Sequence, residues 1–152
     1  MTDPCFSQDD AERAQTPLVV DNIAGATIQK SRIHGFGLFT NKSLAAGTIL
    51  CLLDGQVVSW RSYNAMRAQS PFGAFSPDLF MEWNALDTET LLIRPFRTKY
   101  SYINHSRSPN TMLARFPLRL TAIFDIDPGD ELTIDYRREP LSDDYLRSAT
   151  YL

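Results

Sequence analysis

Short apolar runs separated by glycine, proline, asparagine and aspartate dominate the chain and predict a mainly β protein. Several runs alternate apolar with polar positions, as half-buried strands do. In 131–136 the alternation predicts that leucine, isoleucine and tyrosine point inward while the acids and threonine point outward. The predicted strands cover residues 26–30, 37–40, 48–53, 56–58, 79–83, 90–93, 111–116, 118–124 and 131–136.

One segment departs from this pattern and predicts a helix. Across 59–70, Ser59 is suited to cap the helix, and Trp60, Tyr63 and Met66 recur at helical spacing. Three further segments are expected outside the strands: a loop at 70–78, a tight Asp-Pro-Gly-Asp turn at 127–130 and a short helix at 142–148.

The composition is that of an ordinary globular chain. The 152 residues carry a formal net charge of −3, with 43% hydrophobic and 22% charged residues, which disfavours a disordered protein or a cationic nucleic-acid binder. Two cysteines, Cys5 and Cys51, are too few for a disulfide framework or a four-thiolate zinc site. No run approaches the roughly 20 apolar residues of a membrane helix, and no secretory signal is evident, so we expect a soluble intracellular protein.

Three segments carry candidate chemistry. They are Lys-Ser-Arg-Ile-His-Gly-Phe-Gly-Leu-Phe at 30–39, Tyr-Ile-Asn-His-Ser-Arg-Ser-Pro-Asn at 102–110, and the run from Asp-Pro-Gly-Asp-Glu to Asp-Tyr at 127–136. Each alone has an ordinary explanation: a tight glycine turn, a loop held by its own side chains, and a hairpin turn followed by a strand. The first segment also lacks the third glycine and the following helix of a dinucleotide-binding motif.

Together, in this order and spacing, the three segments resemble the SET domain of protein lysine methyltransferases. The resemblance spans about residues 18–138 and implies a mainly β, β-clip-like fold of several short sheets with one or two short helices. It also implies a knot-like threaded C-terminal segment that brings 104–106 and 136 together. The corresponding organisation is a flexible acidic tail over 1–16, a SET domain over 17–138, and a candidate active-site lid over 139–152.

The resemblance further implies a cofactor and the residues that bind it. S-adenosylmethionine is expected to contact the backbone of His34, Gly35 and Phe36, together with Asn104 and His105. No metal ligands are expected.

Tyr136 closes the third segment and is expected at the point of methyl transfer, with Tyr102 and Ile134 also lining the lysine channel. A phenol with a pKa near ~10 is a poor resting base, so Tyr136 is expected to orient the amine. An apolar channel beside a positive sulfonium lowers the pKa of the lysine ammonium and lets its proton leave to solvent. Ile134 has no hydroxyl to hold a water there, which suggests room for more than one methyl group; the alternative is that Ile134 is simply core.

The chain departs from the family pattern in places. Arg107 stands where many members have cysteine, and no cysteine follows Cys51, so no structural zinc is expected. Ser101 replaces an arginine of the family and removes one hydrogen-bonding group. The lid must therefore come from elsewhere, and the C-terminal segment is the candidate, where an aromatic such as Tyr145 or Tyr151 would stack on the adenine; the alternative is a surface helix with packed tyrosines.

An inserted segment over 59–97 is expected to lie beside the peptide substrate. Its acidic residues favour a basic peptide, whereas the alternative is that its aromatics are core and its acids are merely solvated. The aromatic and acidic residues are Trp60, Tyr63, Phe72, Phe75, Phe80, Trp83, Asp78, Glu82, Asp87 and Glu89.

The leading hypothesis is a compact, zinc-free methyltransferase for a protein lysine. The substrate candidates are histones and non-histone proteins such as ribosomal ones; the rival hypothesis is a catalytically inactive SET-like interaction module. Compact members of the family suggest a homodimer. We expect a cytoplasmic or nuclear, chromatin-associated protein with no direct contact to nucleic acid or membrane.

Overall fold

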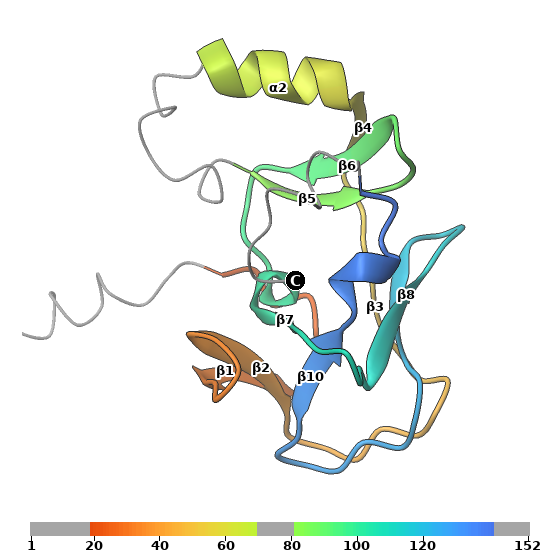
Figure 1. Cartoon of the computed structure of the whole chain (residues 1–152). Coiled ribbons are helices and arrows are strands. Elements are labelled where there is room, and N and C mark those ends of the chain that lie inside the picture. Colours follow the sequence, from red (N-terminus) through yellow and green to blue (C-terminus); the bar gives the residue numbers. More distant parts are fainter. Residues whose placement is uncertain (1–18, 70–80, 142–152) are drawn as a thin grey trace, which may run out of the picture.

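The structure, a computed structural model, describes residues 19–69 and 81–141, which form three small β-sheets and one α-helix (Figure 1). The chain is thus mainly β, as predicted. Several predictions lie outside the described residues: the tail 1–16, the loop 70–78, the helix 142–148 and most of the candidate lid. The knot-like threading stays a prediction.

The first sheet has the strand order β1-β2-β10-β7 and positions the candidate site. β1 and β2 form an antiparallel hairpin, β10 pairs antiparallel with β2, and β7 pairs in parallel with β10. Strands distant in sequence are therefore neighbours in space. The strands are β1 (Ala26–Lys30), β2 (Phe36–Thr40), β10 (Glu131–Ile134) and β7 (Asn104–His105).

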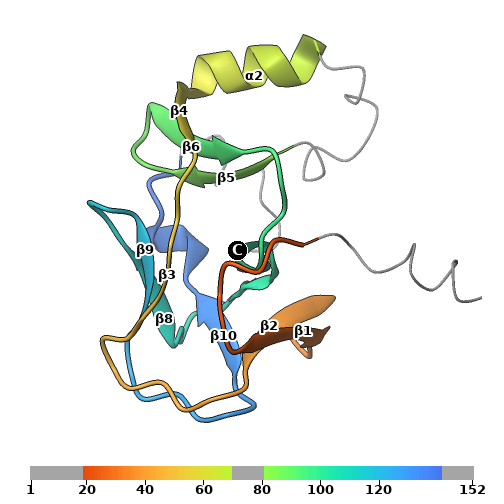
Figure 2. The ribbon, with the colours of Figure 1, turned by 180° about the vertical axis from the view of Figure 1, so that it is seen from behind.

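The other two sheets each have three antiparallel strands, in the orders β3-β9-β8 and β4-β6-β5. Views from opposite sides place the helix α2 and the third sheet at one end of the molecule, with the first sheet toward the other (Figures 1 and 2). These elements are β3 (Ile49–Leu52), β9 (Arg119–Ala122), β8 (Thr111–Ala114), β4 (Gln56–Ser59), β6 (Thr90–Arg94), β5 (Glu82–Ala85) and α2 (Trp60–Gln69). Two 3₁₀ turns, η3 (Lys99–Tyr102) and η4 (Tyr136–Arg138), flank β7 and β10.

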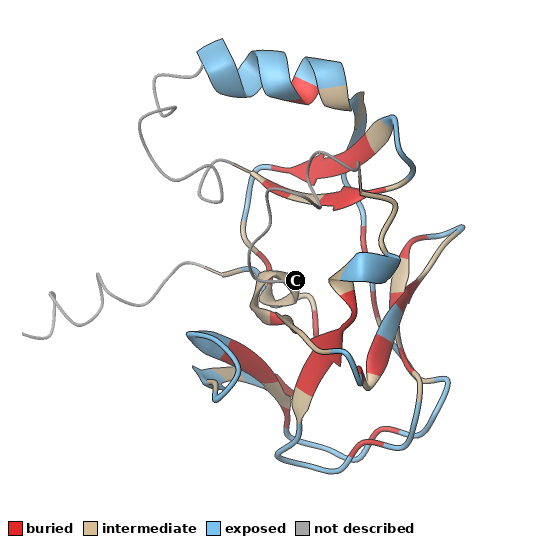
Figure 3. Cartoon of the chain, in the orientation of Figure 1, coloured by how far each residue is buried: buried red, intermediate tan, exposed pale blue. Residues whose placement is uncertain are grey.

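The main core is built by the first and second sheets. Leu38 of β2 lies opposite Leu132 of β10, and both side chains are fully buried, as is Leu120 of β9. A smaller cluster joins α2 to the third sheet, where Tyr63 packs with Leu91. Buried positions accordingly follow the facing strands, whereas most of α2 is exposed (Figure 3). Burying each leucine contributes about 1.5–3 kcal/mol, so the β2–β10 contact is a principal support of the site.

Most predicted elements are present, with bounds that differ by a few residues. The predicted helix is α2, and the predicted turn is formed, with Gly129 at φ +92° and the Asp130 N–H donating to the Asp127 carbonyl at 3.2 Å. The predicted strands 111–116 and 118–124 extend too far, because their ends form the β8–β9 turn and a bend. Phe116 stands in that turn at φ +61°, 94% exposed.

The predicted outward direction of Thr133 and Asp135 is wrong, because both side chains are buried. β10 contacts β8 as well as its sheet neighbours, which buries Thr133, and Asp135 lies beyond β10, where it caps η4 and bonds Arg137. The sequence analysis also missed η3, β7 and η4. A two-residue strand and single 3₁₀ turns leave no periodic pattern to detect.

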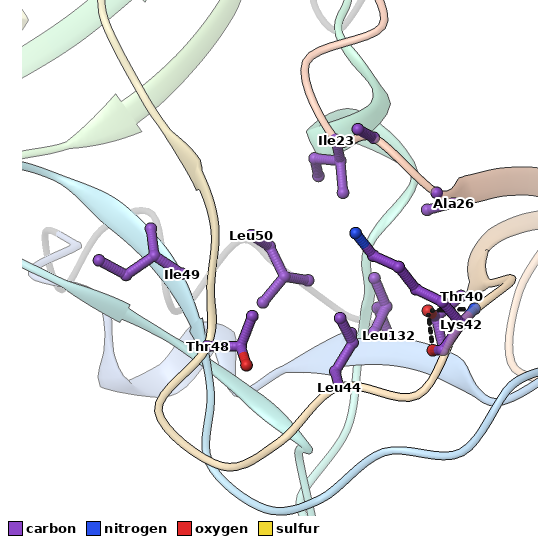
Figure 4. Close-up of a pocket in the computed structure, with 11 residues that line it drawn as sticks. Ile23, Ala26, Thr40, Lys42, Leu44, Thr48, Ile49, Leu50 and Leu132 are labelled. Atoms are coloured by element: carbon purple, nitrogen blue, oxygen red, sulfur yellow. Dashed lines mark hydrogen bonds between the residues drawn. The ribbon is translucent and has the colours of Figure 1, made fainter.

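A small hollow of about 70 Å³ lies beside β1, β2 and β3 (Figure 4). Ile23, Leu44, Leu50 and Leu132 are among its lining residues, and Lys42 reaches along it. None of the predicted site residues lines it, and ligand pockets are typically several times larger, so we do not assign the cofactor to it. Within the described residues, no helix has the length and apolar character needed to cross a bilayer.

Candidate active site

The three motifs meet at Asn104. Its side-chain Nδ2 donates to the backbone carbonyls of His34 and Phe36, each at 3.2 Å, and to the Glu131 carboxylate at 2.7 Å. Ser31 donates its hydroxyl to the same carboxylate, at 2.8 and 2.9 Å from its two oxygens. Segments up to 100 residues apart in sequence are thereby joined by one set of side chains.

The parallel pairing of β7 with β10 brings His105 beside Tyr136. Ile134 lies opposite His105, and its carbonyl accepts the Ser106 N–H at 2.9 Å. The Tyr136 N–H donates to His105 Nδ1 at 3.2 Å, and the two ring centroids are 5.5 Å apart. Because Nδ1 accepts a hydrogen bond, the proton of the neutral ring is assigned to Nε2.

The Tyr136 hydroxyl donates to the backbone carbonyl of Ile103. Ile103 is the buried C-terminal cap of η3, and Tyr136 is the first residue of η4, which Asp135 caps by accepting the Arg137 N–H at 3.1 Å. Two capped turns thus hold the donor and the acceptor in place. The segment 103–106 and Tyr136 lie together, as the resemblance implies.

Asn110 ends the second motif and supports β10 from the side. Its Nδ2 donates to the Glu131 carbonyl at 2.8 Å, and its Oδ1 accepts the Thr133 N–H at 2.8 Å. Thr111 adds a hydroxyl bond to the Thr133 carbonyl at 2.8 Å. Asn110 therefore holds in place the strand that leads to Tyr136, a structural role that the sequence did not reveal.

The remaining predicted site residues differ in exposure. The backbone segment 34–36 is exposed, as a cofactor-binding surface requires. Tyr102 is half-buried, and the Arg97 guanidinium lies 5.7 Å from its ring centroid. Ile134 is only 2% exposed and belongs to the main core, which supports the interpretation of this residue as core.

A neighbouring phenol, Tyr100, was not singled out from the sequence. Burial raises its pKa well above the usual value, and the nearby negative charge of Glu139 acts in the same direction. Burial also raises the pKa of Glu139, although Arg115, at 2.9 Å, opposes this effect. Tyr100 therefore stays neutral and provides a polar group close to Tyr136.

Asp135 carries the clearest electrostatic effect at the site. The Arg137 guanidinium bonds both of its carboxylate oxygens, at 2.8 and 2.7 Å, and this bidentate pair lowers the Asp135 pKa from 3.8 to about 2. The Arg137 N–H favours the ionised form as well. Asp135 is therefore charged throughout the physiological range and keeps η4 capped.

This shift predicts an acid-dependent loss of stability. Because the pKa of Asp135 is lower in the folded chain than in the unfolded chain, its contribution is complete above about pH 4 and is lost as the pH falls toward 2. Urea unfolding between pH 2 and 6 should show the free energy of unfolding falling in that window, with a shallower slope in Asp135→Asn. An identical slope in both proteins would contradict the assignment.

A buried ion pair joins β5 to β6 beside η3, the turn that precedes β7. Arg94 of β6 donates to Glu82 of β5 at 2.7 Å and to the Asn84 side-chain oxygen at 2.9 and 2.7 Å. Its Nε also donates to the Asp54 carbonyl at 3.0 Å. All the side chains that form these bonds are buried, so the guanidinium charge is neutralised within the protein.

The same carboxylate reaches η3. Glu82 accepts the Thr98 N–H at 2.7 Å, the Thr98 hydroxyl at 2.9 Å, and the Ser101 hydroxyl. Thr98 in turn caps η3 by accepting the Tyr100 N–H at 3.2 Å. Ser101, at which the sequence suggested a lost contact, thus connects the site to the third sheet.

These contacts correct one expectation about the inserted segment. Glu82 does not face a peptide, because it is 8% exposed and engaged by Arg94. Asp87 and Glu89 are exposed on the β5–β6 turn, whereas Asp78 lies outside the described residues.

The aromatic side chains of the inserted segment that the structure describes belong to the second cluster. Trp60 makes edge contacts with both Tyr63 and Trp83, with ring centroids 6.1 and 5.1 Å apart. The interpretation as core is therefore correct for Tyr63, which is buried, whereas Trp60 and Trp83 are partly buried and pack against this cluster. Phe72, Phe75 and Phe80 lie outside the described residues.

Comparison with family models identifies this arrangement. The model of the SET domain matches residues 35–137, a range that includes Gly35 and Gly37 of the glycine segment, the Asn-His loop and Tyr136. The chain belongs to the SET-domain family. SET domains are characteristic of the protein lysine methyltransferase superfamily, although some SET proteins are inactive. A search of curated proteins finds no match to this chain.

The residues at this junction fit S-adenosylmethionine, the cofactor that SET methyltransferases typically use. Gly35 has φ +48° and open space where a side chain would stand, so its surface is accessible to a ligand. The carbonyls of His34 and Phe36 are hydrogen-bond acceptors on the same surface, where each accepts from Asn104. Among the described residues, His105 Nε2 is buried without a hydrogen-bond partner, and no group of His, Cys, Asp and Glu side chains could hold a metal ion.

Proposed function

We propose that this SET domain transfers methyl groups from S-adenosylmethionine to the ε-amine of a protein lysine. The parallel pairing of β7 with β10 carries the proposal, because it sets Tyr136 beside 103–105 while Asn104 reaches the first motif. Methyl transfer requires a donor site and an acceptor site that meet at one point. A phenol at the junction of three convergent segments is suited to that point.

The backbone of 34–36 and Asn104 form the proposed donor side. The carbonyls of His34 and Phe36 and the Asn104 amide offer polar contacts to the amino-acid part of the cofactor, and His105 offers the orphaned Nε2. When bound, S-adenosylmethionine supplies an electrophilic methyl group on a positively charged sulfur. The protein's part is to hold that group in line with the incoming amine.

Tyr136 forms the proposed acceptor side. Its hydroxyl donates to the Ile103 carbonyl. A phenolic oxygen also has acceptor capacity, and the proposal is that it accepts an N–H from the lysine amine. This contact directs the nitrogen lone pair toward the methyl group, with reacting atoms ~3–3.5 Å apart. The lysine proton leaves to solvent, since burial near a positive charge lowers the ammonium pKa from its usual ~10.4.

The remaining proposals concern the chain's organisation and partners. We propose residues 17–138 as the SET domain and 139–152 as the segment that closes it. The substrate is proposed to be a histone or another intracellular protein, such as a ribosomal one, met in the cytoplasm or on chromatin. A second copy of the chain, forming a homodimer, is a further proposed partner.

Incubation with methyl-labelled S-adenosylmethionine tests the proposed function. We expect label on protein lysines when core histones or a cell lysate are supplied, and micromolar binding of the cofactor by calorimetry. Mass spectrometry of the product identifies the target lysine and the number of methyl groups. A dimethyl or trimethyl product would support a lysine channel with room for more than one methyl group. Cofactor binding without label on any protein would favour the inactive module, and the absence of both would contradict the proposal.

A further inference from the structure

The Glu131 carboxylate lies at the centre of the site but has no role in the chemistry described above. It is half-buried, and Ser31 and Asn104 bond it from two different motifs. Ser31 Oγ also accepts the backbone N–H of Ile33 at 2.8 Å and that of His34 at 3.4 Å. The carboxylate is therefore tied to the start of the segment proposed to bind the cofactor.

Gly37 shows how closely the chain is built around this carboxylate. A Cβ at position 37 would lie 2.1 Å from Glu131 Oε1 and 2.6 Å from its Cδ, distances that no side chain tolerates. Gly35, two residues earlier, has open space instead and needs glycine for its positive φ. Glycine is thus required at these two positions for different reasons: Gly35 for its backbone conformation, and Gly37 because the Glu131 carboxylate occupies the space of a side chain.

Glu131 makes the shortest of the three hydrogen bonds that fix the orientation of the Asn104 amide. An ionised carboxylate only accepts hydrogen bonds, so it draws the Nδ2 end of the amide toward itself. The carbonyls of His34 and Phe36 accept from the same nitrogen. Asn104 Oδ1 is consequently turned away from all three acceptors, and no donor within residues 19–69 and 81–141 bonds it.

We propose that Glu131 is a positioning residue that orients Asn104 so that its Oδ1 receives the α-ammonium of S-adenosylmethionine. The inference rests on the proposed function and deepens it. An amide oxygen held outward beside two carbonyls is a site for N–H donors, and the negative carboxylate behind it favours a cation. Glutamine at position 131 lacks the negative charge, and its amide N–H can bond Asn104 Oδ1 in competition with the ligand, so only the carbonyls of His34 and Phe36 still hold the amide in place.

The test compares two ligands that share the adenosine and a neutral thioether. S-adenosylhomocysteine carries the α-ammonium, whereas 5′-methylthioadenosine lacks the entire amino-acid chain. By calorimetry, Glu131→Gln should lower the affinity for S-adenosylhomocysteine roughly 10- to 100-fold, which is the contribution of a hydrogen bond to a charged group. The affinity for 5′-methylthioadenosine should change by less than about twofold. A merely structural role would weaken both ligands alike.

Two further variants complete the experiment. Glu89→Gln makes the same chemical change at an exposed glutamate of the β5–β6 turn and should bind both ligands as the unmodified protein does. If Glu131→Gln fails to fold, Glu131→Asp keeps the charge but withdraws it by one methylene, and it should show the same ligand-selective loss. Equal loss of both ligands, or no loss, overturns this inference alone. If the unmodified protein binds neither ligand, both the inference and the proposed function are overturned.

Discussion

We expect Tyr136→Phe, which removes the Tyr136 hydroxyl, to lower the rate of the proposed methyl transfer roughly 10²- to 10³-fold, the range measured when one positioned hydrogen-bonding group is deleted from an active site. The hydroxyl is what joins the ring to the Ile103 carbonyl and what we expect to orient the amine. The phenylalanine ring still packs beside His105, and the backbone bond from position 136 to His105 Nδ1 remains. Cofactor affinity should therefore stay within about twofold, while the single-turnover rate with labelled cofactor falls.

A matched variant separates chemistry from packing. Tyr63→Phe removes the same atom from the buried cluster beneath α2, far from the β7–β10 pairing, and should keep the rate of the unmodified protein if it remains folded. Circular dichroism checks folding in both variants. Tyr136→Phe with an unchanged rate would remove Tyr136 from the proposed mechanism, and a parallel loss of cofactor affinity would show that the hydroxyl acts mainly in binding.

Loss of the buried charge at position 82 produces the largest expected effect on stability. Glu82→Gln keeps the size of the side chain but leaves the Arg94 guanidinium, bonded at 2.7 Å, without its counter-charge. Removing one partner of a buried ion pair typically costs about 3–5 kcal/mol, against a total stability of about 5–15 kcal/mol. Urea unfolding followed by circular dichroism should show this as a large decrease in the midpoint.

The same structure predicts that a second substitution reverses part of this loss. In Glu82→Gln/Arg94→Met no unpaired charge is left in the interior, so the double variant should be more stable than Glu82→Gln alone. Glu89→Gln, at an exposed position on the β5–β6 turn, should change stability by less than about 0.5 kcal/mol. A double variant as unstable as the sum of its single changes would show that the two charges act independently.

The sequence predicts the strands well where local composition decides them. Glycine, proline and aspartate mark the 127–130 turn, and short apolar runs mark β6 and β9. It fails where the tertiary surroundings decide, as at Thr133 on the inner strand β10 and at Asp135, which caps η4, because both alternate like an exposed face but are buried. Local alternation carries no information about which strands cover it.

In the candidate site as well, some contacts could be predicted from the sequence and others could not. The three motifs predicted the meeting of Asn104 with the glycine segment and of His105 with Tyr136, because a resemblance carries long-range information that periodicity lacks. The buried pair of Glu82 and Arg94 depends on the register of β5 against β6, in which these two residues lie directly opposite each other. Opposite charges on adjacent predicted strands are the one pattern that could have suggested it.

β10 is synthesised long after β2, its partner in the sheet, and this order has a consequence for folding on the ribosome. β2 is made early, but Leu38 is covered only when Leu132, on a strand completed at residue 134, has left the ribosome. At about 5–20 residues per second, the nascent hairpin waits roughly 5–20 s with its apolar face open. The candidate site therefore assembles in one late step, and molecular chaperones have a defined interval in which to shield the growing polypeptide.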